Sequence, residues 1–164
     1  LASAVFPYGL NGANLDYLAH APLWKLGKDY GHGTGHGVGC YLNVHEGPHS
    51  IRWKYVKDIE ETVLKEGMVV TDEPGVYLQD KMGIRTENVL LIKEKEHNED
   101  GKFLTFEPLT FVPIDLDAID AAYLEPSDIR RLNEYHKLVF DKISPLLSEE
   151  EREWLYTVTV PLDM

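Results

Sequence analysis

Two segments of the chain carry apolar residues at intervals of three and four, and the first lies near the amino terminus. Residues 14–26 present four such side chains: Leu15, Leu18, Ala19 and Leu26. Asn14 is a candidate N-cap, and Gly27 is a residue type that commonly ends a helix. Pro22 is expected to kink or split the helix, because proline lacks a backbone donor and clashes with the preceding turn.

The second segment with helical spacing lies near the carboxyl end. Residues 127–143 place apolar side chains and one histidine on a single helical face: Ile129, Leu132, His136, Val139, Phe140 and Ile143. This pattern is typical of an amphipathic helix. Ser148 is followed three residues later by Glu151, which is the spacing of a capping box and predicts a short final helix.

Between these helices the sequence favours strands. Runs rich in β-branched and other apolar side chains occupy residues 67–71, 74–78, 84–93 and 103–106. Residues 79–83 are expected to form a hairpin loop. The charged segment 94–102 contains Asp100–Gly101, which is a turn signal before the returning strand.

The first residues and the composition near residue 113 suggest how the chain is divided. Leu1–Phe6 is apolar, has no polar leader and resembles the last turns of a helix, so we expect the chain to be a fragment of a longer protein. Composition changes after Pro113. We therefore expect one region over residues 1–112 and a helical extension over residues 113–164.

Composition and charge exclude several classes of function. The net charge of −12 and the lack of a basic stripe argue against nucleic acid as a partner. No apolar run approaches the roughly 20 residues needed to span a bilayer, so no membrane segment is expected. The single cysteine, Cys40, excludes an intrachain disulfide framework and fits a reducing compartment.

The segment Gly31–Gly39 has glycine at every second position. Each interior glycine costs a helix about 1 kcal/mol relative to alanine, so this segment is not expected to be helical. Glycine at this density indicates close approach of backbone or ligand and leaves the imidazoles as the main projecting groups. We expect residues 30–48 to be extended and irregular, and to form a wall of an active site.

Three histidines lie within this wall: His32, His36 and His45. His32 and His36 are separated by an even number of residues, so in an extended segment both side chains face the same side. A lone histidine is more often a hydrogen-bonded structural residue than a ligand. Three of them in a glycine-rich wall favour a functional role.

Glu73 and Glu87 are the candidate carboxylates. Glu73 directly follows an apolar strand, and Glu87 directly precedes the most apolar part of another. Because an unpaired buried charge is costly, these groups need a partner. Two interpretations remain open: the carboxylates share a cation with an imidazole, or Glu87 pairs with Arg85 and Glu73 merely ends its strand.

Other chemistries fit the residues less well. No serine lies in a nucleophile-elbow context, and no Lys-Ser or Lys-Thr pair completes a phosphate-binding loop. Cys40 lies among apolar residues and glycines, so a small buried thiol is expected there rather than a reactive thiolate.

Four ordered motifs and the tail together resemble a known family. The motifs are residues 32–39, 43–48, 71–77 and 83–88, and the tail segments are 106–110, 132–136 and 144–147. They closely resemble the C-terminal half of aminopeptidase P of the eukaryotic cytosolic type, one of the pitta-bread metallopeptidases. The resemblance implies an α+β fold, with an antiparallel curved sheet and covering helices over residues 1–112.

The resemblance also implies a reaction and a set of site residues. The family removes an N-terminal residue that precedes proline, and uses two divalent metals to generate a hydroxide nucleophile and polarise the scissile carbonyl. The resemblance implies that His36, Glu73 and Glu87 are metal ligands. It also implies that Glu73 transfers protons. His45 and His32 are the substrate-side histidines, and Arg85 orients Glu87. Manganese is the expected metal, and zinc or cobalt also suit these ligands.

Two aspartate ligands of the family have no counterpart in this chain. Asp16 and Asp29 precede His36, but they lie in and just after the predicted helix and do not match that motif. We therefore expect the parent protein to be a cytoplasmic Xaa-Pro aminopeptidase, a homodimer through its C-terminal region, and the isolated chain to be inactive. The alternative is a non-catalytic pitta-bread module that binds peptides or proteins. Retention of all three ligands expected in this half favours the enzyme.

Overall fold

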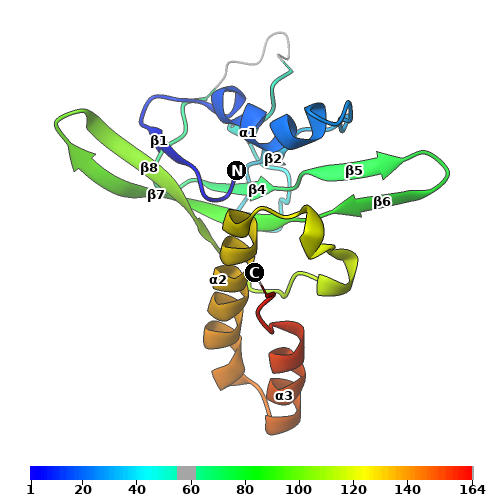
Figure 1. Ribbon diagram of the computed structural model, residues 1–164. Helices are drawn as coiled ribbons and strands as arrows, with labels where there is room; N and C mark the ends of the chain where they lie inside the picture. The colour runs from blue at the N-terminus through cyan, green and yellow to red at the C-terminus, as the bar shows by residue number, and fades with distance from the viewer. Residues whose placement is uncertain (55–61, 164) are drawn as a thin grey trace. The chain divides into compact units, whose positions relative to one another are not determined.

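The computed structural model describes residues 1–54 and 62–163 and divides into two compact units, Leu1–Thr110 and Phe111–Met164. Figure 1 shows the strands in the first unit together with the helix Gly12–Trp24, and the helices Pro126–Ile143 and Glu149–Val158 in the second. The division falls two residues before the boundary expected at 112/113. No helix among the described residues is long and apolar enough to cross a membrane.

The main sheet of the first unit has four antiparallel strands in the order β1-β8-β7-β4. They are β1 (Val5–Pro7), β4 (Val69–Asp72), β7 (Asn88–Asn98) and β8 (Gly101–Pro108). Phe6 pairs with Leu104, and Val70 pairs with Leu90. The sheet therefore joins the two ends of this unit's sequence (Figure 1).

Two small antiparallel sheets lie outside the main sheet. One pairs β2 (Gly35–His36) with β3 (Ser50–Ile51), and the other pairs β5 (Gly75–Leu78) with β6 (Met82–Arg85). A bridge from Gly37 to Val70 connects the glycine-rich segment to β4. Residues 30–48 are otherwise irregular, as predicted.

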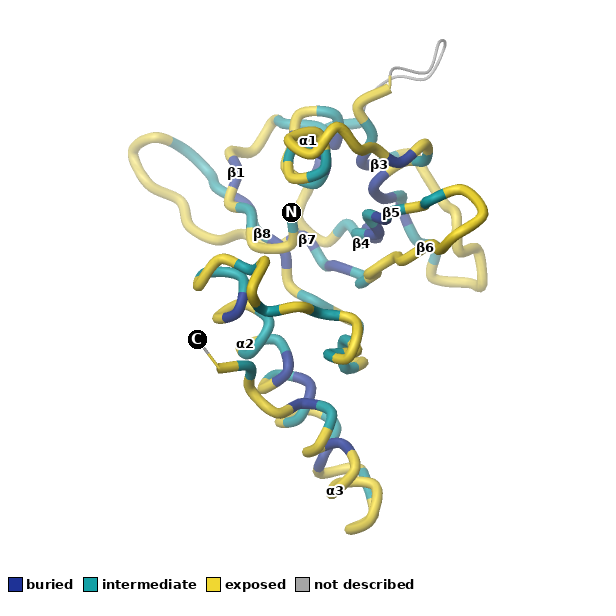
Figure 2. Tube along the Cα trace, turned by 45° about the vertical axis from the view of Figure 1, so that its right-hand side comes forward, coloured by how far each residue is buried: buried dark blue, intermediate teal, exposed yellow. Residues whose placement is uncertain are grey.

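The core of the first unit lies between the main sheet, α1 (Gly12–Trp24) and β3. Leu90 and Ile92 alternate with less buried residues on β7, which is the period of two expected for a strand with one buried face. Full burial of each such side chain contributes about 1.5–3 kcal/mol. Figure 2 shows this burial along the trace, and the cluster comprises Phe6, Leu15, Ile51, Leu64, Val70, Leu90, Ile92, Leu104 and Phe106.

Helix α1 begins two residues earlier than predicted. Asn11 is the N-cap and forms a capping box with Asn14, so Asn14 is the third helical residue rather than the cap. The helix continues through Pro22 to Trp24 without splitting, although proline has no N–H to donate to the carbonyl of Leu18. Gly27 has a φ of 65° and terminates the segment as predicted.

Three predictions about strands are corrected by the structure. The run 84–93 belongs to two strands, because β6 pairs with β5 whereas β7 pairs with β4. The charged segment 94–102 continues the β7–β8 hairpin, with only the turn before Gly101 outside it. Leu1–Phe6 is not the end of a helix: Val5–Pro7 is strand β1, held by β8.

The second unit contains α2 (Pro126–Ile143) and α3 (Glu149–Val158), close to the predicted bounds. The capping box between Ser148 and Glu151 is confirmed. Short 3-10 helices η1 (Leu116–Ala118) and η2 (Ala121–Tyr123) precede α2, and η3 (Ser144–Leu146) follows it. His136 of α2 is fully buried and its Nε2 accepts a hydrogen bond from the Ile114 backbone N–H at 3.0 Å.

This buried histidine makes the stability of the protein sensitive to pH. Burial lowers the pKa of His136 from its usual 6.5. Only the neutral ring accepts from Ile114, so the stabilisation is present above about pH 6.5 and is lost as pH falls through the lowered pKa.

We expect His136→Leu to lower the free energy of unfolding at pH 8 by about 1–3 kcal/mol, because the Ile114 N–H loses its acceptor. The difference in free energy of unfolding between variant and wild type should be smaller when urea unfolding is repeated at pH 5. An unchanged difference at both pH values would contradict this role for the ring. His97→Leu, at an exposed histidine of β7, is the matched control.

Candidate metal centre

The glycine-rich segment lies directly against the end of β4. A Cβ atom on Gly35 would lie 1.9 Å from the Thr71 carbonyl oxygen, so only glycine permits this approach. The Thr34 carbonyl oxygen accepts a hydrogen bond from the Glu73 backbone N–H at 2.8 Å. The backbone contact thus places the histidine-bearing segment beside Glu73.

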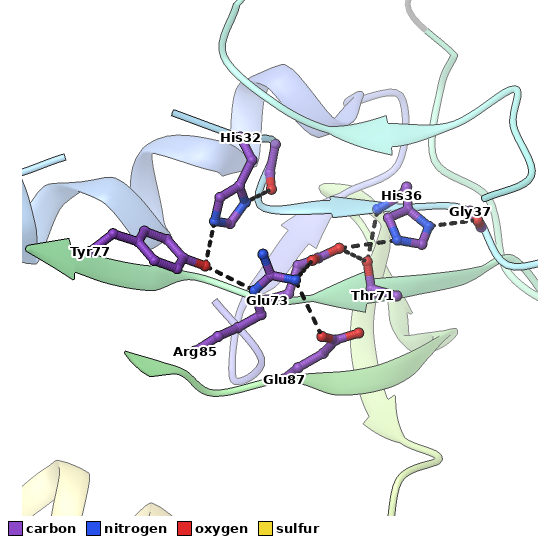
Figure 3. Close-up of polar contacts among 9 residues, drawn as sticks. His32, His36, Gly37, Thr71, Glu73, Tyr77, Arg85 and Glu87 are labelled. Carbon is purple, nitrogen blue, oxygen red and sulfur yellow. Dashed lines mark hydrogen bonds and ion pairs between the residues drawn. The ribbon is translucent and has the colours of Figure 1, made fainter. Parts of the chain in front are cut away.

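His36, Thr71 and Glu73 form one hydrogen-bonded cluster (Figure 3). The His36 backbone N–H donates to Thr71 Oγ1 at 3.0 Å, and this hydroxyl donates to Glu73 Oε1 at 2.8 Å. His36 Nε2 lies 3.1 Å from the same Oε1 atom. Glu73 is only 7% exposed, so its carboxylate depends on these partners for compensation.

The protonation of His36 follows from its other nitrogen. Nδ1 lies 2.9 Å from the Gly37 carbonyl oxygen, which can only accept, so Nδ1 carries a proton. In the neutral ring, Nε2 then carries a lone pair, and this lone pair faces Glu73 Oε1. Two acceptors at this distance require a proton or a cation between them. The pair therefore fits a divalent metal that binds imidazole and carboxylate.

Arg85 and Tyr77 extend the cluster toward His32. One guanidinium nitrogen of Arg85, Nη1, lies 3.1 Å from Glu73 Oε2, and Arg85 Nε donates to the Tyr77 hydroxyl at 2.9 Å. His32 Nδ1 bonds the Gly33 carbonyl at 2.8 Å, so its Nε2 accepts from the same Tyr77 hydroxyl at 2.9 Å. Figure 3 shows this chain of contacts from Glu73 to His32.

Glu87 is less closely associated with the centre. Its Oε2 atom lies 3.9 Å from Arg85 Nη1, the limit of an ion pair, and its side chain is 43% exposed. Within residues 1–54 and 62–163, no group of three or more His, Cys, Asp or Glu side chains is placed to hold a metal ion. The structure brings His36 and Glu73 together, whereas Glu87 reaches Glu73 only through Arg85.

A cavity of about 370 Å³ opens beside these residues, and His32, His36 and His45 all line it. The rings of His36 and His45 are 4.4 Å apart. The remaining lining residues are Gly33, Gly35, Ser50, Arg52, Glu73 and Arg85. The three histidines thus face one space, as the wall predicted from the sequence requires.

Several residues behave differently from the sequence-based picture. Cys40 is exposed rather than buried, and the residues that follow it, Tyr41 and Leu42, are exposed as well. The sequence does not mark Thr71 or Tyr77 as a site residue, although both lie within the motif 71–77. For Thr71 the sequence signal is weak, because a hydroxyl two residues from a carboxylate is common. For Tyr77 there is no local signal, because the pairing of β5 with β6 brings its hydroxyl to Arg85.

The chain belongs to metallopeptidase family M24. The family model matches residues 1–94, and the model for the C-terminal region of peptidase M24 matches residues 102–162. Similar proteins include aminopeptidase P1 of Lotus japonicus, 48% identical over 99% of this chain, and aminopeptidase P1 of Arabidopsis thaliana, 44% identical over 100%. These matches cover 25% and 26% of those proteins, so the chain spans about a quarter of their length.

Solved structures show the same fold. X-prolyl aminopeptidase from Caenorhabditis elegans, described as a cytosolic enzyme with a di-nuclear active site, matches with a TM-score of 0.87 at 41% identity. The match covers 99% of this chain and 26% of that one. X-Pro aminopeptidase from Thermotoga maritima gives a TM-score of 0.50 at 36% identity over 65% of this chain and 26% of its own. The α+β class and the C-terminal part of the pitta-bread fold are thus confirmed.

The close approach at Gly35 is open to a direct test. We expect Gly35→Ala to lower the free energy of unfolding by about 1–3 kcal/mol, because its Cβ would overlap the Thr71 carbonyl. Gly31→Ala is the matched control, since nothing lies within 4 Å of a Cβ there. Equal urea midpoints for the two variants would show that the segment does not depend on contact with β4.

Proposed function

We propose that this chain supplies the C-terminal part of an Xaa-Pro aminopeptidase, which hydrolyses the bond between an N-terminal residue and a following proline. The observation that carries the proposal is the contact of His36 Nε2 with Glu73 Oε1, an imidazole–carboxylate pair opening on a cavity. Membership of a metallopeptidase family and similarity to aminopeptidases P support it.

His36, Glu73 and Glu87 are the residues of this chain that we propose as metal ligands. The C. elegans relative is described as di-nuclear, which supports two ions in the parent protein. We propose manganese, with zinc or cobalt as alternatives that the same donor set accepts. When bound, the ions supply Lewis acidity that activates water and polarises a carbonyl.

We propose that Glu73 accepts and returns a proton during hydrolysis. Oε1 already accepts from Thr71, and Oε2 lies against the Arg85 guanidinium, so the carboxylate is held in one orientation. Arg85 Nη1 also lies 3.9 Å from Glu87 Oε2, and we propose that Arg85 orients both carboxylates. This fixed geometry reduces the rearrangement needed during the reaction.

His32 and His45 are the proposed substrate-side groups. Both line the cavity, and within the described part of the chain neither forms a hydrogen bond or an ion pair with a carboxylate. His45 would stabilise the negative charge that develops on the scissile carbonyl oxygen. His32, held at Nδ1 and Nε2 by Gly33 and Tyr77, would shape the substrate pocket.

The remaining metal ligands are proposed to lie outside this chain. Asp16 and Asp29 contact the two nitrogens of His20 rather than the cavity, so they do not replace the two aspartates of the family. We therefore propose that the isolated chain is inactive.

We also propose a cytoplasmic location, which the cytosolic C. elegans relative supports. A homodimer through the C-terminal region is supported by exposed Leu146 and Trp154 of the second unit.

The parent protein provides the test of activity. With manganese, we expect it to release the N-terminal residue from an Xaa-Pro peptide. Glu73→Gln should lower kcat by about 10²–10⁴-fold, the range typical of a lost proton-transfer group. The matched control is Glu99→Gln, at an exposed position in the β7–β8 turn. Absence of product with the wild type would refute the enzyme and leave the peptide-binding module, and an active Glu73→Gln variant would refute the assigned role.

Metal binding by this chain alone tests whether its ligands suffice. We expect calorimetric titration with manganese to show weak binding or none, because only His36 and Glu73 are brought together. The parent protein should bind more tightly under the same conditions. Sub-micromolar affinity of the isolated chain would contradict the requirement for further aspartates.

A further inference from the structure

A second carboxylate–imidazole cluster lies on the α1 side of the glycine-rich segment and is separate from the cavity. His20 has no exposed surface, and its two ring nitrogens face different aspartates. Nδ1 lies 2.6 Å from Asp29 Oδ1, and Nε2 lies 3.2 Å from Asp16 Oδ2. Asp16 is also fully buried.

The arrangement calls for a positive charge at position 20. A neutral imidazole has one N–H, so it would present a lone pair to one of the two carboxylates. The imidazolium carries an N–H on each nitrogen: at His20, Nδ1 hydrogen-bonds Asp29, and Nε2 lies at ion-pair distance from Asp16 without forming a hydrogen bond. Among the described residues Asp16 Oδ2 has no hydrogen bond, so its compensation comes from the charge of His20 at 3.2 Å. Loss of that charge would leave a buried carboxylate uncompensated, which is costly.

Asp16 connects this cluster to the proposed active site through Thr34. The Thr34 hydroxyl donates to Asp16 Oδ1 and accepts from the Tyr30 hydroxyl. Burial raises the pKa of Tyr30 to about 12, so its hydroxyl stays protonated and remains a donor. The carbonyl oxygen of the same Thr34 bonds the Glu73 N–H at 2.8 Å. One residue thus joins the buried cluster to Glu73.

Stacked rings give a second connection. The ring of His20 stacks on Tyr30 at a centroid distance of 4.0 Å and an angle of 17°. Tyr30 in turn lies 4.8 Å from the ring of His32, which lines the cavity. Hydrogen bonds from the Trp24 indole and the His20 ring hold the pKa of Asp29 below its usual value, although burial acts to raise it. Asp29 therefore remains an anion that orients His20.

We propose that His20 is a positioning residue: clamped between Asp16 and Asp29, it holds Thr34 and Tyr30 and thereby sets the positions of Glu73 and His32 in the cavity. The effect on catalysis rests on the proposed function, whereas the effect on His32 does not. A cation at position 20, rather than histidine itself, is what the site requires. Arginine meets this need, since its guanidinium is always charged and has several donors.

The experiment compares His20→Gln, which removes the charge, with His20→Arg, which retains it, in the full-length protein. His97→Gln is the matched control at an exposed histidine. With manganese and an Xaa-Pro peptide, we expect His20→Gln to lower kcat by about 10–100-fold with KM within about twofold, because reacting groups are misplaced by a fraction of an ångström. His20→Arg should recover most of the loss.

A second readout does not depend on activity. In metal-free protein labelled with ¹⁵N-histidine, His32 should show a single Nδ1–H tautomer in the wild type and in His20→Arg, and a mixture in His20→Gln. If the parent proves inactive, the proposed function fails while this measurement still decides the positioning role. If His20→Gln does not fold, Thr34→Val removes the linking hydroxyl at nearly constant shape and takes its place.

The proposal is overturned by either of two results. One is a His32 tautomer that stays single in a folded His20→Gln variant or in Thr34→Val, whether or not the parent protein is active. The other is a His20→Arg variant no better than His20→Gln, which would show that the imidazole shape and not the charge matters. A lowered melting temperature with unchanged kcat and tautomer would likewise assign His20 a merely structural role.

Discussion

The contact between the glycine-rich segment and the end of β4 is the constraint on which the site depends. The Thr34 carbonyl bonds the Glu73 N–H, and the backbone at Gly35 approaches Thr71 more closely than any other residue type permits. His36 and Glu73 belong to segments far apart in the sequence, so their pairing at 3.1 Å exists only because these backbones meet. Side-chain chemistry then follows from a backbone approach that glycine makes possible.

The same segment separates two clusters of similar composition but different character. On one side Asp16, His20 and Asp29 form a cluster in which both Asp16 and His20 are sealed from solvent. On the other side His36 and Glu73 border an open cavity, with Arg85 as their cationic neighbour. Exposure distinguishes them: a sealed ion pair rigidifies its surroundings, whereas an accessible pair is free to bind a cation and a substrate.

Local patterns predicted the elements that local forces form. Helix α2 and the Ser148–Glu151 capping box were placed correctly, because helical periodicity and capping act within a few residues. The wrong predictions concern segments whose secondary structure depends on pairing with strands distant in the sequence. Leu1–Phe6 has helix-like composition, but β8 pairs with Val5–Pro7 and makes it a strand. The apolar run at 84–93 is divided because its two halves pair with different strands.

The sequence by itself determined which chemistry is present: histidines in a glycine-rich wall, and carboxylates beside apolar strands. It also determined the family through ordered motifs, since their residue types and spacing survive without coordinates. Only the tertiary structure decided that Thr71 and Arg85 compensate Glu73, that Tyr77 joins Arg85 to His32, and that Asp16 and Asp29 serve His20. The physical reason is that hydrogen bonds and ion pairs depend on distances of about 3 Å. Strand pairing and close backbone approach set these distances, and the separation of two residues in the sequence does not reveal them.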